Sequence, residues 1–246
     1  MRSVPVWDFP TRAFHWTLAV AVVLSYLTGG EDGSLFVVHT VSGYVVALLL
    51  VFRLVWGFVG SVHSRFSDFV YSGKSVKAYA KQLLRFAPPR FVGHNPLGGW
   101  MVILMLAVLA GTVATGLFSG DDDGGAGILL PLIAAPGGEG LKEIHEFFGN
   151  FIIALAAIHV VAVVVDWLLT KDNLVRAMVT GRKSLDDEQA ARQKPLARGW
   201  RSAIVAVIVA GLGAVLFQQT DFGALATAGE RGGYQHQSER HEVEHD

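Results

Sequence analysis

The chain contains no cysteine among its 246 residues. This absence excludes disulfide bonds, iron–sulfur clusters bound through thiolates, and the C-x-x-C-H attachment of a c-type haem. Any metal must therefore be bound through nitrogen or oxygen ligands. Charged residues are also scarce, at 17%, whereas 52% of the residues are hydrophobic. This composition is typical of an integral membrane protein, and we expect no nucleic-acid partner.

Five hydrophobic segments predict transmembrane helices, because lipid offers no hydrogen-bond partners to a backbone in other conformations. They cover residues 13–28, 36–58, 98–118, 147–169 and 200–217. The first segment follows a positive charge, as a signal peptide does, but lacks an A-x-A-like cleavage site, so we expect it to be retained. The predicted fold class is an all-α integral membrane protein.

Basic residues gather in two of the four connections between these segments. Those after the second and fourth segments contain Arg65, Lys74, Lys77, Lys81, Arg85, Arg90, Lys171, Arg176, Arg182, Lys183, Arg192, Lys194 and Arg198. The first and third connections instead contain mainly Glu31, Asp32, Asp121, Asp122, Asp123 and Glu139. Cytoplasmic loops hold the excess of Lys and Arg. We therefore expect a multi-pass protein of the bacterial inner membrane, with its N-terminus cytoplasmic and its C-terminus periplasmic.

Two polar regions accompany the hydrophobic segments. The cytoplasmic connection 61–96 contains an amphipathic helical pattern that ends before Pro88. This helix either packs on the protein or lies on the lipid surface, and the sequence leaves both interpretations open. Residues 218–246 are polar and rich in glycine, which predicts a disordered periplasmic tail. A solvated tail is a commoner role for its three histidines than metal binding; they are His236, His241 and His245.

Four histidines lie at membrane depth, where ionisable side chains are costly and call for a function. His15, His39 and His145 lie near the starts of the first, second and fourth segments, and His159 lies farther along the fourth. The last two are separated by 14 residues, or about 21 Å of helix, and share one helical face. Depth then pairs His15 with His159 on the cytoplasmic side, and His39 with His145 on the periplasmic side.

Two imidazoles that face each other from different helices are the axial ligands that a low-spin b-type haem requires. The sequence therefore predicts two haem b groups, with these four histidines as iron ligands. Gly43 and Gly149 lie four residues after His39 and His145, where a missing Cβ lets a flat macrocycle approach the helix. The alternative is that the histidines form hydrogen bonds between helices or a proton relay.

Several other polar residues have two interpretations each. Arg12 and Arg53 are candidates to bind the propionates of the cytoplasmic haem, or they are ordinary basic flanks of a membrane helix. His63 and His94 are expected at the surface or at an interface. If one of the four histidines is not a haem ligand, His94 is the first alternative candidate. Asp166 is a candidate proton carrier for a quinone, although a carboxylate snorkelling from a helix end is the commoner role.

The sequence resembles the prokaryotic cytochrome b561 family, close to the b-type subunits of nickel–iron hydrogenases. The resemblance covers residues 6–182 and rests on WDFPTRAFHW at 7–16, HTVSGYVVALLLVFR at 39–53, WGFVGSVHSRFSDF at 56–69, GHNPLGGW at 93–100 and the two histidines of the fourth segment. It implies a four-helix transmembrane haem-binding bundle with two b haems on the same four histidines. Residues 183–217, a linker with a fifth transmembrane helix, and the tail 218–246 depart from this pattern.

The resemblance also implies electron exchange between quinone and a periplasmic or membrane partner. The first hypothesis is an electron-transfer cytochrome that serves a periplasmic c-type cytochrome, since acidic outer loops suit a basic partner. The second is the membrane anchor of a hydrogenase or dehydrogenase. The third, a superoxide:quinone oxidoreductase, ranks lower because acidic loops repel an anion. A homodimer is a candidate assembly. Under the first two hypotheses the chain is an oxidoreductase subunit and not a stand-alone catalyst. A further alternative is a haem-free transporter or scaffold, which would show no Soret absorption band.

Overall fold

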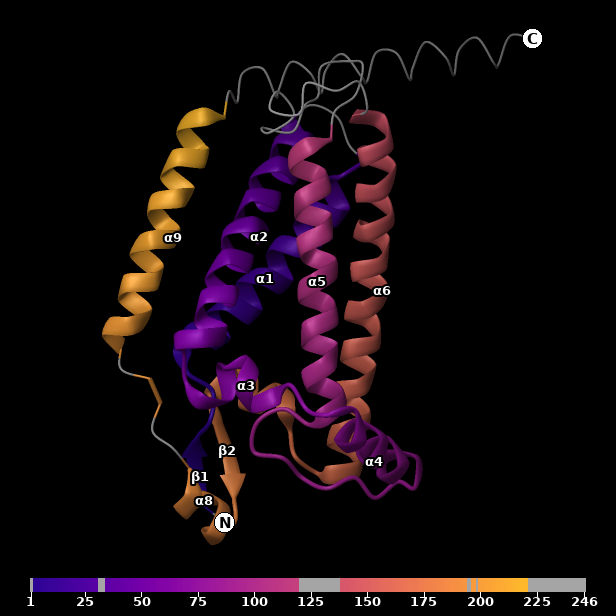
Figure 1. The fold of residues 1–246 in the computed structure, drawn as a ribbon, viewed down its shortest axis with the longest axis vertical. Helices are drawn as coiled ribbons and strands as arrows, with labels where there is room; N and C mark the ends of the chain where they lie inside the picture. The colour runs from indigo at the N-terminus through magenta and orange to yellow at the C-terminus, as the bar shows by residue number, and fades with distance from the viewer. Residues whose placement is uncertain (1, 31–33, 120–137, 194–195, 198, 221–246) are drawn as a thin grey trace, which may run out of the picture. The chain divides into compact units, whose positions relative to one another are not determined.

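The computed structural model describes residues 2–30, 34–119, 138–193, 196–197 and 199–220. These residues form helices and one two-stranded sheet (Figure 1). In chain order the elements are β1 (Arg2–Pro5), α1 (Phe9–Thr28), α2 (Ser34–Val59), the 3-10 helix η1 (Val62–Ser64), α3 (Phe66–Phe69), α4 (Gly73–Leu84), α5 (Pro96–Phe118), α6 (Gly138–Thr170), α7 (Leu174–Thr180), β2 (Arg182–Leu185), α8 (Asp187–Arg192) and α9 (Gly199–Gln219). The tail histidines lie outside the described residues.

The five predicted hydrophobic segments all lie in long helices, namely α1, α2, α5, α6 and α9. The largest difference is in α6, which begins at Gly138 and not near residue 147. Four of these described helices, α2, α5, α6 and α9, are long and apolar enough to cross a membrane. The fifth, α1, is not among the four, because polar residues such as Arg12 and His15 lower its hydropathy.

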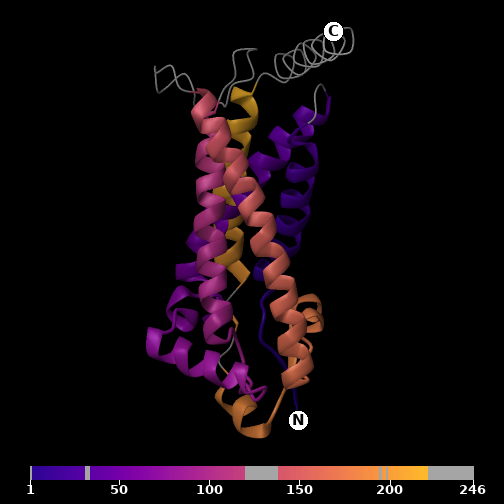
Figure 2. The same ribbon diagram turned by 90° about the vertical axis from the view of Figure 1, so that its right-hand side faces the viewer.

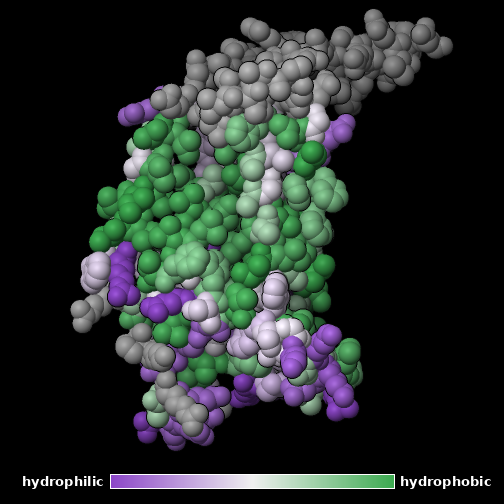
Figure 3. All heavy atoms as spheres, in the orientation of Figure 1, coloured by the Kyte–Doolittle hydropathy of each residue, from purple (hydrophilic) through white to green (hydrophobic). Residues whose placement is uncertain are grey.

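The apolar side chains of these helices mostly face outward. Only 17% of the most apolar window of α2 is buried within the protein, and only 6% of that of α9. Hydrophobic residues accordingly cover the long helices in the face shown in Figure 3, while hydrophilic residues gather over α4 and the β1–β2 segment. Helices that are apolar on their outer surface require lipid around them. The chain is therefore a helical integral membrane protein, as predicted.

Capping residues define where two of the long helices begin. Asp8 precedes α1, and its Oδ1 accepts a hydrogen bond from the Thr11 backbone N–H at 2.8 Å. Asn95 precedes α5, and its Oδ1 accepts from the Gly98 backbone N–H at 2.7 Å. Pro96 is the first residue of α5, where its missing N–H costs nothing. The N-terminal end of each helix is thus specified locally.

The chain divides into two compact units, each of which takes part of every long helix. Unit 1 comprises Met1–Trp16, Leu50–Val108 and Phe151–Val209. Unit 2 comprises Thr17–Leu49, Leu109–Asn150 and Ala210–Asp246. Helix α6 is unbroken from Gly138 to Thr170 (Figure 2) and contributes residues to both units. The predicted domain boundaries along the chain, at residues 182 and 217, stay predictions.

Unit 1 contains a small sheet that the sequence did not predict. Strands β1 and β2 pair in antiparallel register, with Ser3 opposite Ser184. Val6, Trp7, Ala177 and Leu185, the last residue of β2, form a buried cluster next to the sheet. Each strand has only four residues, which is too short for an alternating pattern to stand out. The sheet does not alter the mostly helical class.

The amphipathic helix predicted within residues 61–96 is α4. Its N-cap is Ser72, whose hydroxyl accepts from the Ser75 backbone N–H at 3.3 Å. Tyr79 is buried, so this face of α4 packs on the protein. Leu84 at the end of α4 is 80% exposed, and Phe86 just beyond it is 77% exposed. The helix therefore has one packed face and an exposed apolar end.

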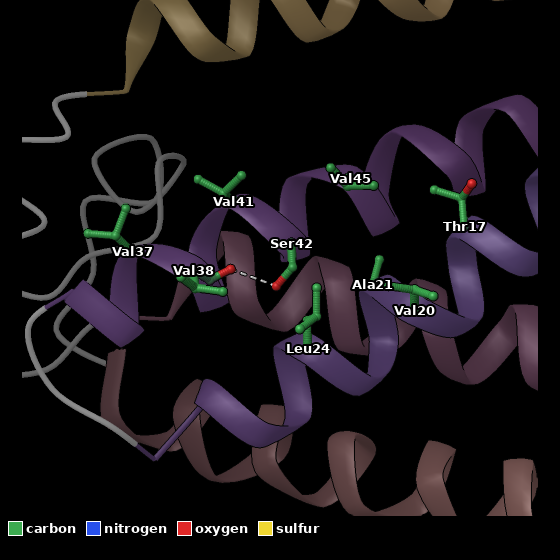
Figure 4. Close-up of a pocket in the computed structure, with 9 residues that line it drawn as sticks. All are labelled: Thr17, Val20, Ala21, Leu24, Val37, Val38, Val41, Ser42 and Val45. Carbon is green, nitrogen blue, oxygen red and sulfur yellow. Dashed lines mark hydrogen bonds between the residues drawn. The ribbon is translucent and has the colours of Figure 1, made fainter.

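Unit 2 contains an open apolar groove between two helices. Figure 4 shows its lining, which comes from α1 through Thr17, Val20, Ala21 and Leu24, and from α2 through Val37, Val38, Val41, Ser42 and Val45. The Ser42 hydroxyl donates to the Val38 carbonyl at 2.7 Å, so it is satisfied within its own helix. In the same unit α9 approaches α2, because a Cβ on Gly213 would lie 3.0 Å from Leu48 Cδ1.

Candidate haem-binding sites

His39 of α2 and His145 of α6 face each other in unit 2. Their ring centroids are 5.9 Å apart, and the ring planes are at 85°. The Nδ1 atom of His39 is 2.8 Å from the Ser25 carbonyl oxygen, and that of His145 is 2.8 Å from the Thr112 carbonyl oxygen. A carbonyl only accepts, so each Nδ1 carries the proton and donates it. The lone pair of each Nε2 is thereby left available to a metal.

Two glycines make room for these imidazoles, and sequence reasoning missed both. A Cβ on Gly29 would lie 3.1 Å from Cε1 and Nδ1 of His39. A Cβ on Gly116 would lie 2.7 Å from Cε1 of His145, closer than real Cβ contacts occur. Gly29 follows the end of α1 and Gly116 belongs to α5, whereas the histidines they touch belong to α2 and α6. No spacing rule within one helix could therefore have identified them.

The predicted haem-contacting glycines have open space beside them. A Cβ on Gly43 or on Gly149 would meet no atom within 4 Å. Both positions are only partly exposed, and each lies one turn beyond a ligand candidate, His39 or His145. An open strip next to the imidazoles is what the edge of a flat macrocycle requires. These glycines therefore fit a haem, although their contact with it stays a prediction.

His15 of α1 and His159 of α6 form the corresponding pair in unit 1. Their ring centroids are 6.4 Å apart, with the ring planes at 55°. The His15 ring also contacts Trp16 edge-on at 4.9 Å between centroids. Unlike its counterparts in unit 2, the buried Nδ1 of His15 has no hydrogen-bond partner among the described residues. The two pairs are thus alike in spacing and different in their hydrogen bonds.

The spacing of both pairs fits one iron between two imidazoles. With about 2 Å between a metal and each imidazole nitrogen, two rings on opposite sides of it have centroids roughly 6 Å apart. The observed separations are 5.9 and 6.4 Å. A porphyrin fills four positions on its iron and leaves two for the protein, which is the number of imidazoles each pair offers. The residues present therefore fit two haem groups.

Arg12 and Arg53 are more buried within the protein than basic residues that merely flank a membrane helix. Arg53 is 3% exposed, lies against the rings of Phe66 and Phe69, and has a buried Nη1 without a hydrogen-bond partner among the described residues. Arg12 donates from Nη1 to the Val179 carbonyl at 2.6 Å, but its buried Nε is likewise unpartnered there. Buried guanidinium N–H groups without a hydrogen-bond acceptor are costly. Both therefore suit the carboxylates of a bound group such as haem propionates.

His94 is partly buried among aromatic rings, so of the two expected places it occupies an interface and not the surface. Its ring lies between those of Trp7 and Phe69, with centroids 4.9 and 4.6 Å away. Burial, followed by the nearby Arg53 charge, lowers the pKa of His94 to about 3. No local sequence pattern indicates this environment, because the aromatic residues around His94 come from two distant segments. His94 is not adjacent to either histidine pair in the ring contacts described.

His63 is held by polar partners at the edge of the same region. Its Nδ1 is 2.8 Å from Asp68 Oδ2, and its Nε2 is 3.1 Å from Gln193 Oε1. Burial opposes protonation of His63, but the hydrogen bonds with Asp68 and Gln193 outweigh it and raise its pKa. This residue is therefore a link between the η1–α3 region and the segment after α8.

Asp166 does not snorkel freely, contrary to the sequence interpretation. Its Oδ1 accepts hydrogen bonds from the Tyr79 hydroxyl at 2.9 Å and from Asn95 Nδ2 at 3.0 Å. Burial, and then the Asp166 charge, raise the pKa of Tyr79. This carboxylate thus joins α6 to α4 and to the N-cap residue of α5. Its partners are 87 and 71 residues away in the chain, beyond the reach of local patterns.

The comparisons with known proteins agree with this geometry. A family model for prokaryotic cytochrome b561 matches residues 6–181. A protein from Rhizobium leguminosarum bv. viciae, named a probable Ni/Fe-hydrogenase B-type cytochrome subunit, is 25% identical over 219 residues, covering 76% of this chain and 92% of the relative. A protein of the same name from Cupriavidus necator is 24% identical, covering 76% and 89%. A probable Ni/Fe-hydrogenase 1 B-type cytochrome subunit from Escherichia coli K12 is 24% identical, covering 73% and 90%.

No solved structure matches this chain. The family match runs from the end of β1 to the glycine that ends α7, and it leaves α9 outside. It includes all four histidines and both arginines discussed above. Proteins of this kind use haem b to carry electrons, which agrees with two pairs of facing imidazoles in a helical membrane protein. The chain belongs to the prokaryotic cytochrome b561 family, as a membrane cytochrome with a role in electron transfer.

Proposed function

We propose that this chain is a di-haem b-type cytochrome that passes electrons across the bacterial inner membrane. The observation that carries the proposal is the presence of two pairs of facing imidazoles, with centroids 6.4 and 5.9 Å apart. His15 and His159 would bind one haem b, and His39 and His145 the other. With both axial positions filled by protein, neither iron has an open position for oxygen, which suits an electron carrier.

The residues of the chain bind and orient the two haems. Ser25 and Thr112 hold the rings of His39 and His145 through their backbone carbonyls, which leaves each Nε2 free to bind an iron. Gly43 and Gly149 leave space for the macrocycle edge in unit 2. Arg12 and Arg53 would bind propionates in unit 1. The bound haems supply the one-electron chemistry.

The orientation follows from the charges of the connections. The connections that contain α4 and α7 hold most of the Lys and Arg residues, which favours their placement in the cytoplasm. The N-terminus is then cytoplasmic and the C-terminus periplasmic. The His39–His145 pair belongs to the periplasmic side and the His15–His159 pair to the cytoplasmic side. A quinone in the membrane is the partner at one end of this path.

The partner at the other end is a periplasmic redox protein. Relatives from several bacteria are named as cytochrome subunits of Ni/Fe hydrogenases, which favours a docked hydrogenase or dehydrogenase subunit over a soluble c-type cytochrome. Acidic residues in the periplasmic connections suit a basic docking surface on either partner. The same charges disfavour superoxide as a substrate.

The proposal is tested by reconstituting the purified cytochrome in lipid nanodiscs with a water-soluble quinone. Reduction of both haems by a co-purified hydrogenase subunit under hydrogen, followed by reoxidation with the quinone, is the expected result. A reduced c-type cytochrome serves as the competing donor. Haems that exchange electrons with neither donor nor with quinone would contradict the proposed function.

A further inference from the structure

His94 and Arg53 each have one buried nitrogen atom without a hydrogen-bond partner among the described residues, namely Nδ1 of His94 and Nη1 of Arg53. Both side chains lie against the ring of Phe69, with the His94 centroid 4.6 Å and the Arg53 Cζ 5.6 Å from its centroid. Both belong to unit 1, which also contains the His15–His159 pair. Buried donors without an acceptor are costly, so two of them on one ring indicate an acceptor that they share.

The carboxylates close to these two side chains are occupied by other donors. The charge of Asp8 acts on Arg53, but no ion pair between them occurs in the described part of the chain. Instead, Asp8 Oδ1 accepts from a backbone N–H of α1 at 2.8 Å, and Oδ2 accepts from the Trp56 indole at 3.2 Å. Asp68 Oδ2 is 2.8 Å from His63 Nδ1. The two unpaired nitrogens therefore suit the acceptor of a bound group.

The charges around His94 favour an anion as this group. Arg53, His63 and Lys183 act on His94 as cations, and Asp68 opposes them. Burial, and then the Arg53 charge, lower the pKa of His94 to about 3. At neutral pH the imidazole is therefore uncharged and donates a hydrogen bond from Nδ1, while the guanidinium of Arg53 supplies the counter-charge. Such hydrogen bonds are strengthened by the low dielectric of a site enclosed by aromatic rings.

The place of His94 relative to the histidine pair suits the edge of a haem. Asn95, the residue after His94, donates from Nδ2 to Asp166 Oδ1 of α6 at 3.0 Å. Asp166 follows His159 by seven residues, which corresponds to about 10 Å along the helix. A haem carries both propionates on one edge of its macrocycle, at a comparable distance from the iron. A haem bound by His159 therefore has a carboxylate within reach of His94.

We propose that His94 and Arg53 bind the same propionate of the haem in unit 1, His94 through its Nδ1–H and Arg53 through its guanidinium. This inference rests on the proposed function and deepens it by adding a residue to the haem site. It also replaces the interpretation of His94 as an alternative iron ligand. In this role His94 binds the edge of the cofactor and positions it, and transfers neither an electron nor a proton.

The test is redox-difference infrared spectroscopy of the purified holoprotein in nanodiscs, with haem that is isotopically labelled at its propionate carboxyl carbons. Bands that move with the label belong to propionates and not to an inorganic anion from the buffer. His94→Leu should shift one labelled carboxylate band, because that carboxylate loses a hydrogen bond. His94→Asn should restore most of the band position, because its amide N–H group replaces the donor at Nδ1.

Three results would contradict different parts of the account. Labelled bands that stay unchanged in His94→Leu would overturn the inference while leaving a di-haem cytochrome intact. A band that shifts in His94→Leu but does not move with the label would identify a buffer anion, and would also overturn it. Wild-type protein with a single haem would instead contradict the proposed function, so the failures are distinguishable.

Midpoint potentials test whether the two side chains share one carboxylate. His94→Leu and Arg53→Gln each leave the propionate less well neutralised, which stabilises ferric iron. Each should therefore lower the midpoint of the spectral component that His15→Ala removes, and leave the other component unchanged. The shift in the double variant should differ from the sum of the single shifts, because residues with a shared partner are coupled. Additive shifts would overturn the shared carboxylate.

Tyr71→Phe is the matched control for local packing. The Tyr71 hydroxyl donates to the backbone carbonyl of His94 at 3.1 Å and not to its ring. This variant changes the surroundings of the same residue and keeps the Nδ1 donor, so it should leave the labelled bands and both midpoints unchanged. Equal band shifts in Tyr71→Phe and His94→Leu would show that the bands report packing, and would overturn the assignment.

Discussion

Gly116 lies against the imidazole of His145, and a Cβ on this glycine would be 2.7 Å from Cε1 of the ring. Helix α5 therefore touches the candidate haem ligand of α6 directly, and the same ring donates to the Thr112 carbonyl one turn earlier on α5. The ring is held between a carbonyl that fixes its tautomer and a glycine that leaves it room. A ligand oriented in this way is prepared for the metal before binding.

The contact between Gly116 and the His145 ring predicts the effect of adding one methyl group at position 116. Gly116→Ala should displace the His145 ring and reduce the occupancy of the haem in unit 2 by half or more. The haem content per chain, measured as the pyridine haemochrome, reports the loss. Gly211→Ala is the matched control, because a Cβ at Gly211 of α9 would meet no atom within 4 Å. Full haem content in Gly116→Ala would contradict the role of this glycine.

The Asp166 hydrogen bonds predict a loss of stability without loss of haem. Asp166→Ala leaves the Tyr79 hydroxyl and the Asn95 amide without their acceptor, which should cost about 2–3 kcal/mol. The free energy of unfolding in a denaturant titration measures this cost. The control is Asp187→Ala, which removes an exposed ion pair with Arg2 and should change stability by less than about 0.5 kcal/mol. Equal effects of the two variants would refute the linking role of Asp166.

The lowered pKa of His94 predicts that the protein loses stability in acid. Its pKa is lowered from 6.5 to about 3, first by burial and then by Arg53. The unfolded chain therefore takes up a proton below pH 6.5 that the folded chain takes up only near pH 3, so stability falls with pH through this window. The loss at pH 5 should be about 1–2 kcal/mol. His94→Leu should lose less stability between pH 7 and pH 5 than wild type, as measured by thermal unfolding.

His63 predicts the opposite dependence on pH. Although burial opposes it, the hydrogen bonds with Asp68 and Gln193 raise the pKa of His63 above its ordinary value. The stabilisation is fully present below pH 6.5 and is lost as the pH rises through the raised pKa. His63→Gln should therefore flatten the decline in stability on the alkaline side and leave the acid side unchanged. A variant that changes the acid side alone would show that the two histidines were assigned wrongly.

The pairing of the four histidines could be predicted from the sequence, because membrane depth limits which residues meet. The pairs expected from depth are the pairs whose rings lie close together, although ligation of iron stays a prediction. Gly29, Gly116 and the two carbonyl acceptors could not be predicted, since the glycines lie in other parts of the chain than the histidines they touch and the acceptors are backbone atoms. The positions of the long helices could likewise be predicted from the hydropathy of the sequence.

The part of the fold outside the long helices was less predictable. The β1–β2 sheet, the burial of His94 and the partners of Asp166 all join segments that are far apart in the chain. Contacts of this kind depend on tertiary packing and leave no periodic signal in either segment. The burial of Arg53 was missed for the same reason, because its covering residues Phe66 and Phe69 lie in α3, which follows the membrane helix.

The central claim is that two pairs of imidazoles each bind one haem b. The most direct measurement is the haem content per chain of wild type and of the four single variants His15→Ala, His159→Ala, His39→Ala and His145→Ala, with low-temperature difference spectra to separate the two haems. We predict two haems in the wild type, loss of one spectral component in the first two variants, and loss of the other component in the last two. Loss of the same single component in all four variants would contradict the account.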